Sequence, residues 1–284
     1  MAKKRKRTYT TRRSSKKTQW RKIIISSAWL MMIIALLSLT GRHLFDKYEG
    51  HVWDTTGYGE LEKVVYEPGK NIQVSTYKGF TVYFNPGFHV PDCVVYELTR
   101  DEVKGQVPRH KNFMPDSDIS ESAYPQDYVN SGYDRGHMAP AGDMKWDKDA
   151  MRESFYMSNI CPQNKKLNSG AWNHLEEEIR YWADRDSALI VITGPVFGKN
   201  IKRIGKSGVG VPKQFYKILF APYMPNPRAI GFLYDNAPSN KRMEKHVVTV
   251  DSIESITGYD FFSSLPDELE DRIESNSDFK DWDR

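Results

Sequence analysis

Residues 131–140 read SGYDRGHMAP, and residues 158–176 read SNICPQNKKLNSGAWNHLE. The first stretch places an arginine, a glycine and a histidine side by side, and the second combines several asparagines with a glutamate. Hydrolysis of a phosphodiester needs a base for water, positive charge for the phosphate oxygens and help for the leaving oxygen. Because the two stretches together contain such residues, we predict that they form one hydrolytic site.

His137 is the candidate general base. A histidine whose pKa is near 6.5 is largely neutral at physiological pH and can still accept a proton from water. Arg135 could stabilise charge on phosphorus, and Gly136 would allow the backbone to approach a phosphate closely. A single histidine is more often structural, but the Arg-Gly neighbourhood favours the catalytic interpretation of His137.

Asn168 allows two interpretations. An asparagine before a helix usually caps it, because its side chain accepts hydrogen bonds from the first free amides. Its neutral carbonyl oxygen is also a suitable ligand for a hard cation such as Mg²⁺. Glu176 follows eight residues later, about two helical turns, so it would share a face with Asn168 and could hold the waters of a metal ion. Arg180 continues that stripe and could reach a phosphate or brace Glu176.

Taken in order, the two stretches resemble the DNA/RNA non-specific endonuclease family, whose signature is an Asp-Arg-Gly-His element followed by an asparagine-bearing helix. The resemblance runs from roughly Val65 to the C-terminus and includes residues 193–197 and 211–213. It implies a ββα-metal (His-Me) finger in which Asn168 is the metal ligand. It further implies one Mg²⁺, with Mn²⁺ or another divalent ion as alternatives, DNA and RNA as substrates, and products with 5′-phosphate ends.

The resemblance also suggests supporting residues. Asn159 is similar to the residue that orients the surroundings of the histidine, Gln163 to a supporting site residue, and Arg109 to an upstream arginine that binds substrate. Two other functions stay open. One is a membrane-tethered nucleic-acid receptor without catalysis, and the other is a His-Me-finger phosphodiesterase acting on a different substrate. Because a receptor could discard His137 or Asn168, their presence favours the enzyme.

The remaining pattern predicts an α+β domain with a mainly antiparallel sheet. Short runs rich in Val, Ile, Tyr and Phe are typical of strands, and tryptophan, leucine and isoleucine at three- and four-residue spacings predict one long helix. The predicted strands are 80–84, 93–98, 154–160, 188–193, 214–220 and 229–234, and the long helix is 170–185. A second helix is expected after Ser264, with Pro266 near its first turn.

The N-terminal forty residues predict a membrane anchor. Residues 1–22 contain 11 Lys and Arg and no acid, and residues 23–40 are uncharged and mostly apolar. Such a run can just cross a bilayer as a helix, and the basic block on one side predicts a cytoplasmic N-terminus, with the body across the membrane. That far side would be a bacterial periplasm or exterior. A cleaved signal peptide and a mitochondrial inner-membrane location are the alternatives.

Beyond the anchor we expect a linker over residues 41–64 and the nuclease domain over residues 65–284. After Lys22, 30 basic residues face 37 acidic ones, so any nucleic-acid site must be a local basic patch on an acidic body. Cys93 and Cys161 belong to no metal-binding cluster, which argues against structural zinc. Buried free thiols and a disulfide both remain open for them, and oligomeric state is not predicted.

Overall fold

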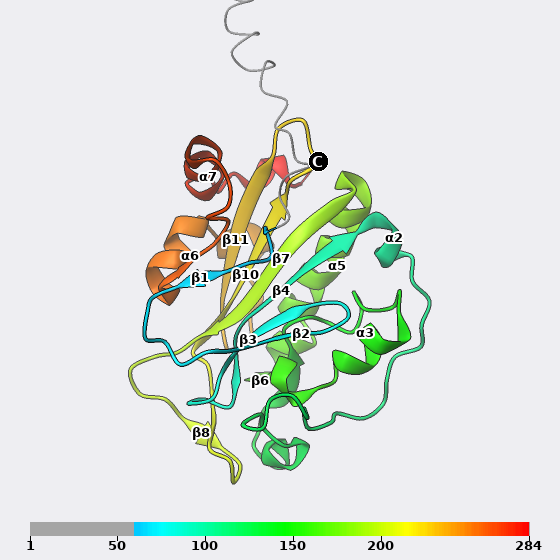
Figure 1. Cartoon of the computed structure of the whole chain (residues 1–284), viewed down its shortest axis with the longest axis vertical. Coiled ribbons are helices and arrows are strands. Elements are labelled where there is room, and N and C mark those ends of the chain that lie inside the picture. The colour runs from blue at the N-terminus through cyan, green and yellow to red at the C-terminus, as the bar shows by residue number, and fades with distance from the viewer. Residues whose placement is uncertain (1–59, 284) are drawn as a thin grey trace, which may run out of the picture. The chain divides into compact units, whose positions relative to one another are not determined.

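The computed structural model describes residues 60–283. Within them, the central element is a seven-stranded sheet in which every pair of neighbours is antiparallel (Figure 1). Its order is β12 (Val247–Val248), β11 (Arg228–Asp235), β10 (Gln214–Ala221), β7 (Ala188–Val196), β4 (Val90–Thr99), β3 (Thr81–Asn85) and β2 (Gln73–Thr76). The predicted α+β class with an antiparallel sheet is confirmed.

The central strands are buried on both faces. All nine residues of β7 are buried, and seven of the eight in β10. A strand covered on both faces reads as a nearly continuous apolar run, which is why the sequence predicted these strands. Alternate side chains of β10 point to opposite faces: Phe215 packs against Trp172, whereas Tyr216 packs against Phe261.

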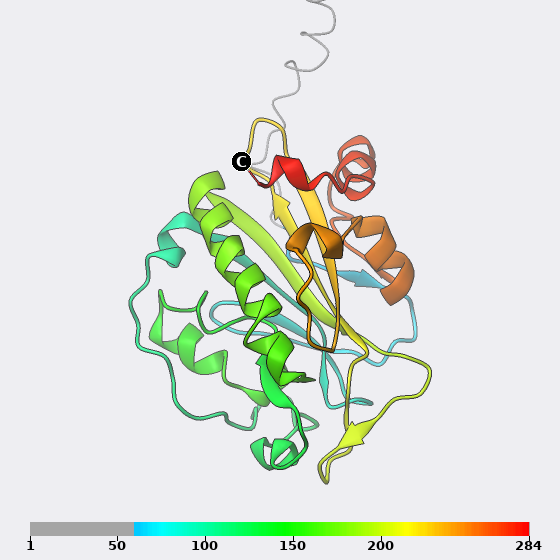
Figure 2. The same cartoon turned by 180° about the vertical axis from the view of Figure 1, so that it is seen from behind.

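Each face of the sheet carries its own helices. The long helix α5 (Ala171–Asp186) lies across one face (Figure 2). Its Trp172 packs against Phe215, and its Trp182 stacks on Phe232. Helices α6 (Val250–Thr257) and α7 (Asp267–Glu274) contact β11, and the segment between them packs Phe262 against Phe220 of the other face. The predicted helices at 170–185 and after Ser264 are confirmed, and Pro266 is the N-cap residue of α7.

A separate two-stranded ribbon precedes α5. Strand β5 (Asp134–His137) pairs with β6 (Ile160–Gln163), so that His137 lies opposite Ile160 and Asp134 opposite Gln163. The short helix α4 (Lys165–Asn168) and then α5 follow directly. Two paired strands followed by a helix are the ββα arrangement expected from the sequence, and they place both sequence stretches of interest in one unit.

The strand predicted over residues 154–160 is wrong. Asp147 caps helix α3 (Lys148–Glu153) and accepts hydrogen bonds from the first amides of that helix. Ser154 still donates its amide to Ala150, and the chain then turns through a 3-10 segment (Met157–Asn159) before β6 begins. The Asn159 side chain donates to the Ser154 carbonyl, so this carbonyl has no need of a strand partner.

The remaining elements are short. They are β1 (Val65–Tyr66) paired with β13 (Tyr259–Asp260), β8 (Arg203–Ile204) paired with β9 (Val209–Gly210), helix α2 (Arg100–Val103), and 3-10 segments at Pro125–Tyr128, Met243–His246 and Phe279–Asp281. Leu61 and Val64 are already buried in the body. Cys93 and Cys161 are both buried free thiols.

The predicted basic tail (1–22) and anchor (23–40), and most of the predicted linker (41–64), lie outside the described residues. Among residues 60–283, no helix has the length and apolar character needed to cross a membrane.

Candidate active site

His137 is held by aromatic rings. Its ring lies 5.3 Å from that of Phe113 and 4.9 Å, edge to face, from that of Phe155, and the residue is only 8% exposed. Neither ring nitrogen has a hydrogen-bond partner within residues 60–283, and Nε2 is fully buried. Burial, and after it the positive charge of Arg109, lower the pKa of His137 to about 3. The imidazole is therefore neutral, with one ring nitrogen that carries no hydrogen and can accept a proton.

Asn159 fixes the chain immediately after His137. Its side-chain oxygen accepts a hydrogen bond from the Ala139 amide, and its nitrogen donates to the Ala139 carbonyl, both at 2.9 Å. The same nitrogen donates to the Ser154 carbonyl at 2.8 Å. Asn159 is fully buried, so these bonds lock the end of β5 onto the start of β6. The structure thus places Asn159 beside the histidine strand without direct contact to the imidazole.

Gly136 contacts a side chain, where the sequence suggested close approach to a phosphate. A Cβ atom at Gly136 would lie 2.2 Å from Oε1 of Gln163, the residue that follows its own strand partner Cys161 by two positions. Gln163 is completely buried, and both its amide oxygen and its amide nitrogen lack a partner within the described chain. Glycine is needed at position 136 because the Gln163 side chain occupies the space of a Cβ.

Asp134 orients Asn168. The Asn168 side-chain nitrogen donates a hydrogen bond of 3.1 Å to Oδ2 of Asp134, which lies three residues before His137 in the same strand. An ionised carboxylate can only accept, so the nitrogen of the amide must face Asp134. The carbonyl oxygen of Asn168 is then turned away from Asp134 and forms no hydrogen bond with residues 60–283.

Asn168 does not cap α5, so that alternative is wrong. It is the last residue of α4, whose N-cap is Asn164, and Gly170 is the N-cap position of α5. The break at residues 169–170 also means that Asn168 and Glu176 do not belong to one continuous helix. The two-turn spacing argument from the sequence therefore does not hold as stated.

Glu176 is a partly buried residue of α5, and its carboxylate interacts with the buried positive charge of Lys217. Burial is the main reason that its pKa is raised to about 7, while the positive charge of Lys217 lowers it. Lys217 is completely buried on β10, donates to Thr193 at 2.8 Å and lies 4.9 Å from the centre of the Trp172 ring. Burial lowers the pKa of Lys217, and Glu176 opposes that shift. The two groups form an electrostatic pair.

Arg180 is bound to Asp143 instead of bracing Glu176. Its guanidinium donates a 2.8 Å hydrogen bond to Asp143, which is 1% exposed and also accepts from Tyr96 at 2.7 Å. Burial lowers the pKa of Arg180, but the charge and hydrogen bond of Asp143, followed by the charge of Glu176, raise it overall. Arg180 is therefore a structural cation beneath the site, and its reach towards a phosphate is restricted by this ion pair.

Arg109 and Arg135 are held on the two rings that also pack against His137. The Arg109 guanidinium lies 5.1 Å from the centre of Phe155, and that of Arg135 lies 4.6 Å from Phe113. Arg109 influences the pKa of both His137 and Glu176, so its charge acts on both parts of the candidate site. Arg135 borders a hollow of about 560 Å³, which is also lined by Lys111, Phe113 and Tyr124 among other residues. This hollow offers cations and aromatic rings to a nucleic-acid strand.

The residues around Asn168 fit a hard divalent cation. An amide oxygen without a hydrogen bond matches the oxygen ligands that Mg²⁺ uses while it keeps several waters. Asp134 has the place of an outer residue that fixes the orientation of a ligand.

Comparison with known proteins identifies the family to which the chain belongs. The profile of the DNA/RNA non-specific endonuclease family matches residues 57–268. The chain belongs to this family. The resemblance carried by its two sequence stretches is thereby confirmed, and both stretches lie inside the matched range.

Named relatives in the family include nucleases from distant organisms. The chain is 33% identical over 230 residues to human "Nuclease EXOG, mitochondrial", 31% over 209 residues to human "Endonuclease G, mitochondrial", and 34% over 214 residues to "Nuclease" of Nostoc sp.. These alignments cover 73%, 68% and 70% of this chain, and 62%, 70% and 76% of the relatives. The chain thus spans less than two thirds of the length of human EXOG.

A solved structure of a family member has the same fold. It is described as the crystal structure of an EndoG/EndoGI complex that shows the mechanism of EndoG inhibition. The TM-score is 0.64 at 28% identity, and the alignment covers 69% of this chain and 88% of that one.

Asn236 is a positioning residue of this family member that the sequence did not reveal. Its side-chain oxygen accepts from the Asn164 amide at 2.7 Å, and its nitrogen donates to the carbonyls of Pro162 and Pro212 at 3.0 Å each. It joins strand β6, the N-cap of α4 and the loop before β10. Because these partners are 24 to 74 positions away, no local pattern could have indicated its role. Lys217 did carry a clue, as a lone charge in the apolar run of β10.

Proposed function

We propose that this chain is a metal-dependent endonuclease that hydrolyses phosphodiester bonds of both DNA and RNA and leaves 5′-phosphate ends. One observation carries the proposal. Asp134 turns the amide of Asn168 so that the amide oxygen is free. Three residues after Asp134, in the same strand, lies His137, whose neutral imidazole has no hydrogen-bond partner in the described chain. A free base on β5 and a free oxygen ligand on the adjoining helix α4 are groups that metal-assisted hydrolysis requires.

His137 acts as the general base and takes a proton from the attacking water. The low pKa of His137 disfavours its protonation in the free enzyme, but an incoming phosphate brings negative charge that offsets Arg109 and favours the imidazolium form. Arg135 stabilises charge on the phosphate during attack. Asn159 keeps the backbone after His137 in place, so that the imidazole moves little as it changes charge.

Asn168 would hold the metal ion, and Glu176 would orient the waters around it. We propose Mg²⁺ as the ion. When bound, it supplies positive charge to the phosphate and to the leaving oxygen. Gln163 supports the ribbon on which the base lies, through its contact with Gly136.

The proposed activity has no base selectivity. Contacts to phosphate carry no sequence information, and the candidate groups around His137 are cations and rings suited to a backbone and to stacked bases. Family membership and the printed names of the nuclease relatives support a nucleic-acid substrate.

The test is cleavage of plasmid DNA and of a structured RNA by the full chain, with Mg²⁺ or with EDTA, for wild type and His137→Ala. We expect cleavage of both substrates by the wild type with Mg²⁺ only, and a loss of rate of at least about 100-fold in the variant. End-labelling of the products distinguishes 5′-phosphate from 5′-hydroxyl ends. A wild type that binds both substrates and leaves them intact would instead support a receptor without catalysis.

We further propose that residues 23–40 anchor the enzyme in a membrane, with residues 1–22 in the cytoplasm and the nuclease domain on the far side, such as a bacterial periplasm. The charge asymmetry around the apolar run supports this orientation. A reporter that is active only in the cytoplasm, fused after Arg284, should stay silent. Activity of that reporter would show that the C-terminus lies in the cytoplasm and would contradict the proposed orientation.

A further inference from the structure

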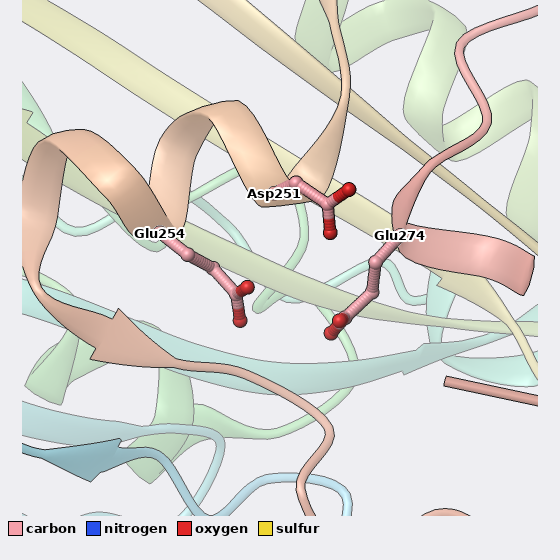
Figure 3. A group of neighbouring side chains, drawn as sticks. All are labelled: Asp251, Glu254 and Glu274. Carbon is pink, nitrogen blue, oxygen red and sulfur yellow. The ribbon is translucent and has the colours of Figure 1, made fainter. Parts of the chain in front are cut away.

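Three carboxylates converge between helices α6 and α7 (Figure 3). Asp251 and Glu254 lie one turn apart on α6, and Glu274 is the last residue of α7. Each offers a carboxylate oxygen, and these oxygens lie within 4.8 Å of one another. The cluster lies at the face of the sheet opposite α5, away from His137 and Asn168.

Glu274 is the unusual member of this group. It is only 6% exposed, its side chain extends from α7 towards the level of the Glu254 carboxylate (Figure 3), and its Oε1 atom is fully buried without a hydrogen-bond partner among residues 60–283. A buried carboxylate that lacks partners is costly unless a cation or a proton neutralises it. Glu274 also lies at the C-terminal end of α7, where the helix dipole is negative and further disfavours a negative side chain.

No basic side chain balances the cluster. Within the described part of the chain, none of the three carboxylates forms a salt bridge. One oxygen of Glu254 accepts a hydrogen bond from the Phe261 amide at 2.7 Å. Burial, and then the charges of Glu254 and other neighbouring acids, raise the pKa of Glu274 to about 9. Burial is also the main reason that the pKa of Glu254 is raised to about 7. Both shifts follow from burial and from the like charges of the cluster.

We propose that Asp251, Glu254 and Glu274 form a Ca²⁺ site that ties α6 to α7, separate from the catalytic centre. Ca²⁺ binds six to eight oxygens in flexible geometry and accepts several carboxylates. Mg²⁺ needs a strict octahedron, keeps several waters and usually binds through only one or two carboxylates. Three carboxylates from two helices therefore favour Ca²⁺.

The site would stabilise the region of the fold that depends on α6 and α7. Both helices contact β11, and they bury Ile253, Leu269 and Ile273. Without a cation, mutual repulsion of the carboxylates pushes the two helices apart unless protons are taken up. With Ca²⁺ bound, the same charges hold them together.

The test uses Ca²⁺ alone and the full 284-residue chain, purified in a mild detergent. To exclude binding at the catalytic centre, all proteins carry Asn168→Ala. We expect Ca²⁺ at a hundredfold excess over its Kd to raise the melting temperature on the order of 5 °C. This rise should disappear after Glu274→Gln or Asp251→Asn, and isothermal titration calorimetry should show one Ca²⁺ bound per chain before the substitution and none after it.

Glu268→Gln is the matched control, because Glu268 is an exposed acid on α7 that does not belong to the cluster. Its Ca²⁺ response should equal that of the parent protein. Asp251 is exposed, so Asp251→Asn gives a result even if the buried substitution impairs folding. No calorimetric binding in the Asn168→Ala protein, or equal binding in the Asp251→Asn variant, would overturn the Ca²⁺ site while leaving the nuclease proposal untouched.

Discussion

The side-chain nitrogen of Asn168 donates a 3.1 Å hydrogen bond to Asp134, and this contact joins the two sequence stretches that the chain places 34 positions apart. Asp134 begins the strand that ends at His137, and Asn168 ends the helix α4 that follows the partner strand. The orientation of one amide is therefore set by the same strand that positions the base. A change at Asp134 should consequently affect metal binding without removing a metal ligand.

Replacing Asp134 by asparagine should weaken metal dependence. An amide at position 134 can donate as well as accept, so Asn168 is no longer forced to turn its oxygen away. We expect the Mg²⁺ concentration for half-maximal cleavage to rise about 10-fold to 100-fold, the usual cost of losing a residue that orients a ligand. Mg²⁺ titrations of plasmid cleavage measure this, with Glu268→Gln on α7 as an acid-to-amide control away from the site. An unchanged Mg²⁺ requirement would remove Asp134 from this role.

Gly136→Ala should destabilise the ribbon. The new Cβ would meet Oε1 of Gln163 at 2.2 Å and its Cβ at 2.6 Å, so β5 and β6 must separate. We expect a loss of about 1 to 3 kcal/mol in the free energy of unfolding, measured by urea denaturation. Gly198→Ala is the control, because its Cβ would meet Lys213 at 3.4 Å, an ordinary contact.

Shortening Gln163 provides an internal check on that explanation. In a Gly136→Ala/Gln163→Ala double variant the closest clash is gone but the Cβ of residue 163 remains. Stability should therefore recover in part, and the two substitutions should be clearly non-additive. Strict additivity would show that the cost at position 136 has another origin.

His137 should make the protein less stable in acid. Its pKa is about 3 in the folded protein and near 6.5 in an unfolded chain, so between these values the unfolded chain binds more protons. The free energy of unfolding then falls as pH drops below 6.5, by about 1.4 kcal/mol per pH unit for this residue. The stability difference between wild type and His137→Gln should thus change by up to about 2 kcal/mol between pH 7.5 and pH 5.

The exposed His174 supplies the comparison for that experiment. His174→Gln should leave the pH dependence of unfolding close to that of the wild type. If His137→Gln behaves in the same way, the imidazole of His137 is not held neutral by its surroundings.

Local patterns predicted the parts of the fold that depend on local physics. The buried strands β7 and β10 are nearly continuous apolar runs. The buried residues of α5 follow the helical period at Trp172, Leu175, Ile179 and Trp182. The predicted strand over residues 154–160 failed because a side chain, that of Asn159, takes the carbonyl that a neighbouring strand would have used. No periodicity encodes such a contact.

The candidate site divides in the same way. His137, Asn168 and their neighbours could be named because the residue types and their order carry the chemistry. The partner of Arg180 could not, because Asp143 lies 37 positions away and reaches it only through the packing of α5 on the sheet. Glu274 was equally hidden, since its isolation depends on how α7 meets α6. The role of a residue that acts through another residue depends on tertiary contacts, which the local sequence does not show.

Lys217 is the last of these hidden residues, and its removal should shift the pH dependence of cleavage. Its positive charge lowers the pKa of Glu176, so in Lys217→Met that pKa should rise above its value of about 7. Glu176 must be ionised to hold the waters of a metal ion, so the acid limb of kcat/KM should move to higher pH, by about one unit. Measurement of cleavage from about pH 5.5 to about pH 9, which spans the acid limb, tests this. Lys280→Met, which replaces an exposed lysine, is the control. Methionine fills the buried space, so a proportional loss of rate at every pH would mean that Lys217 only supports packing, whereas a displaced limb means that its charge sets the ionisation of Glu176.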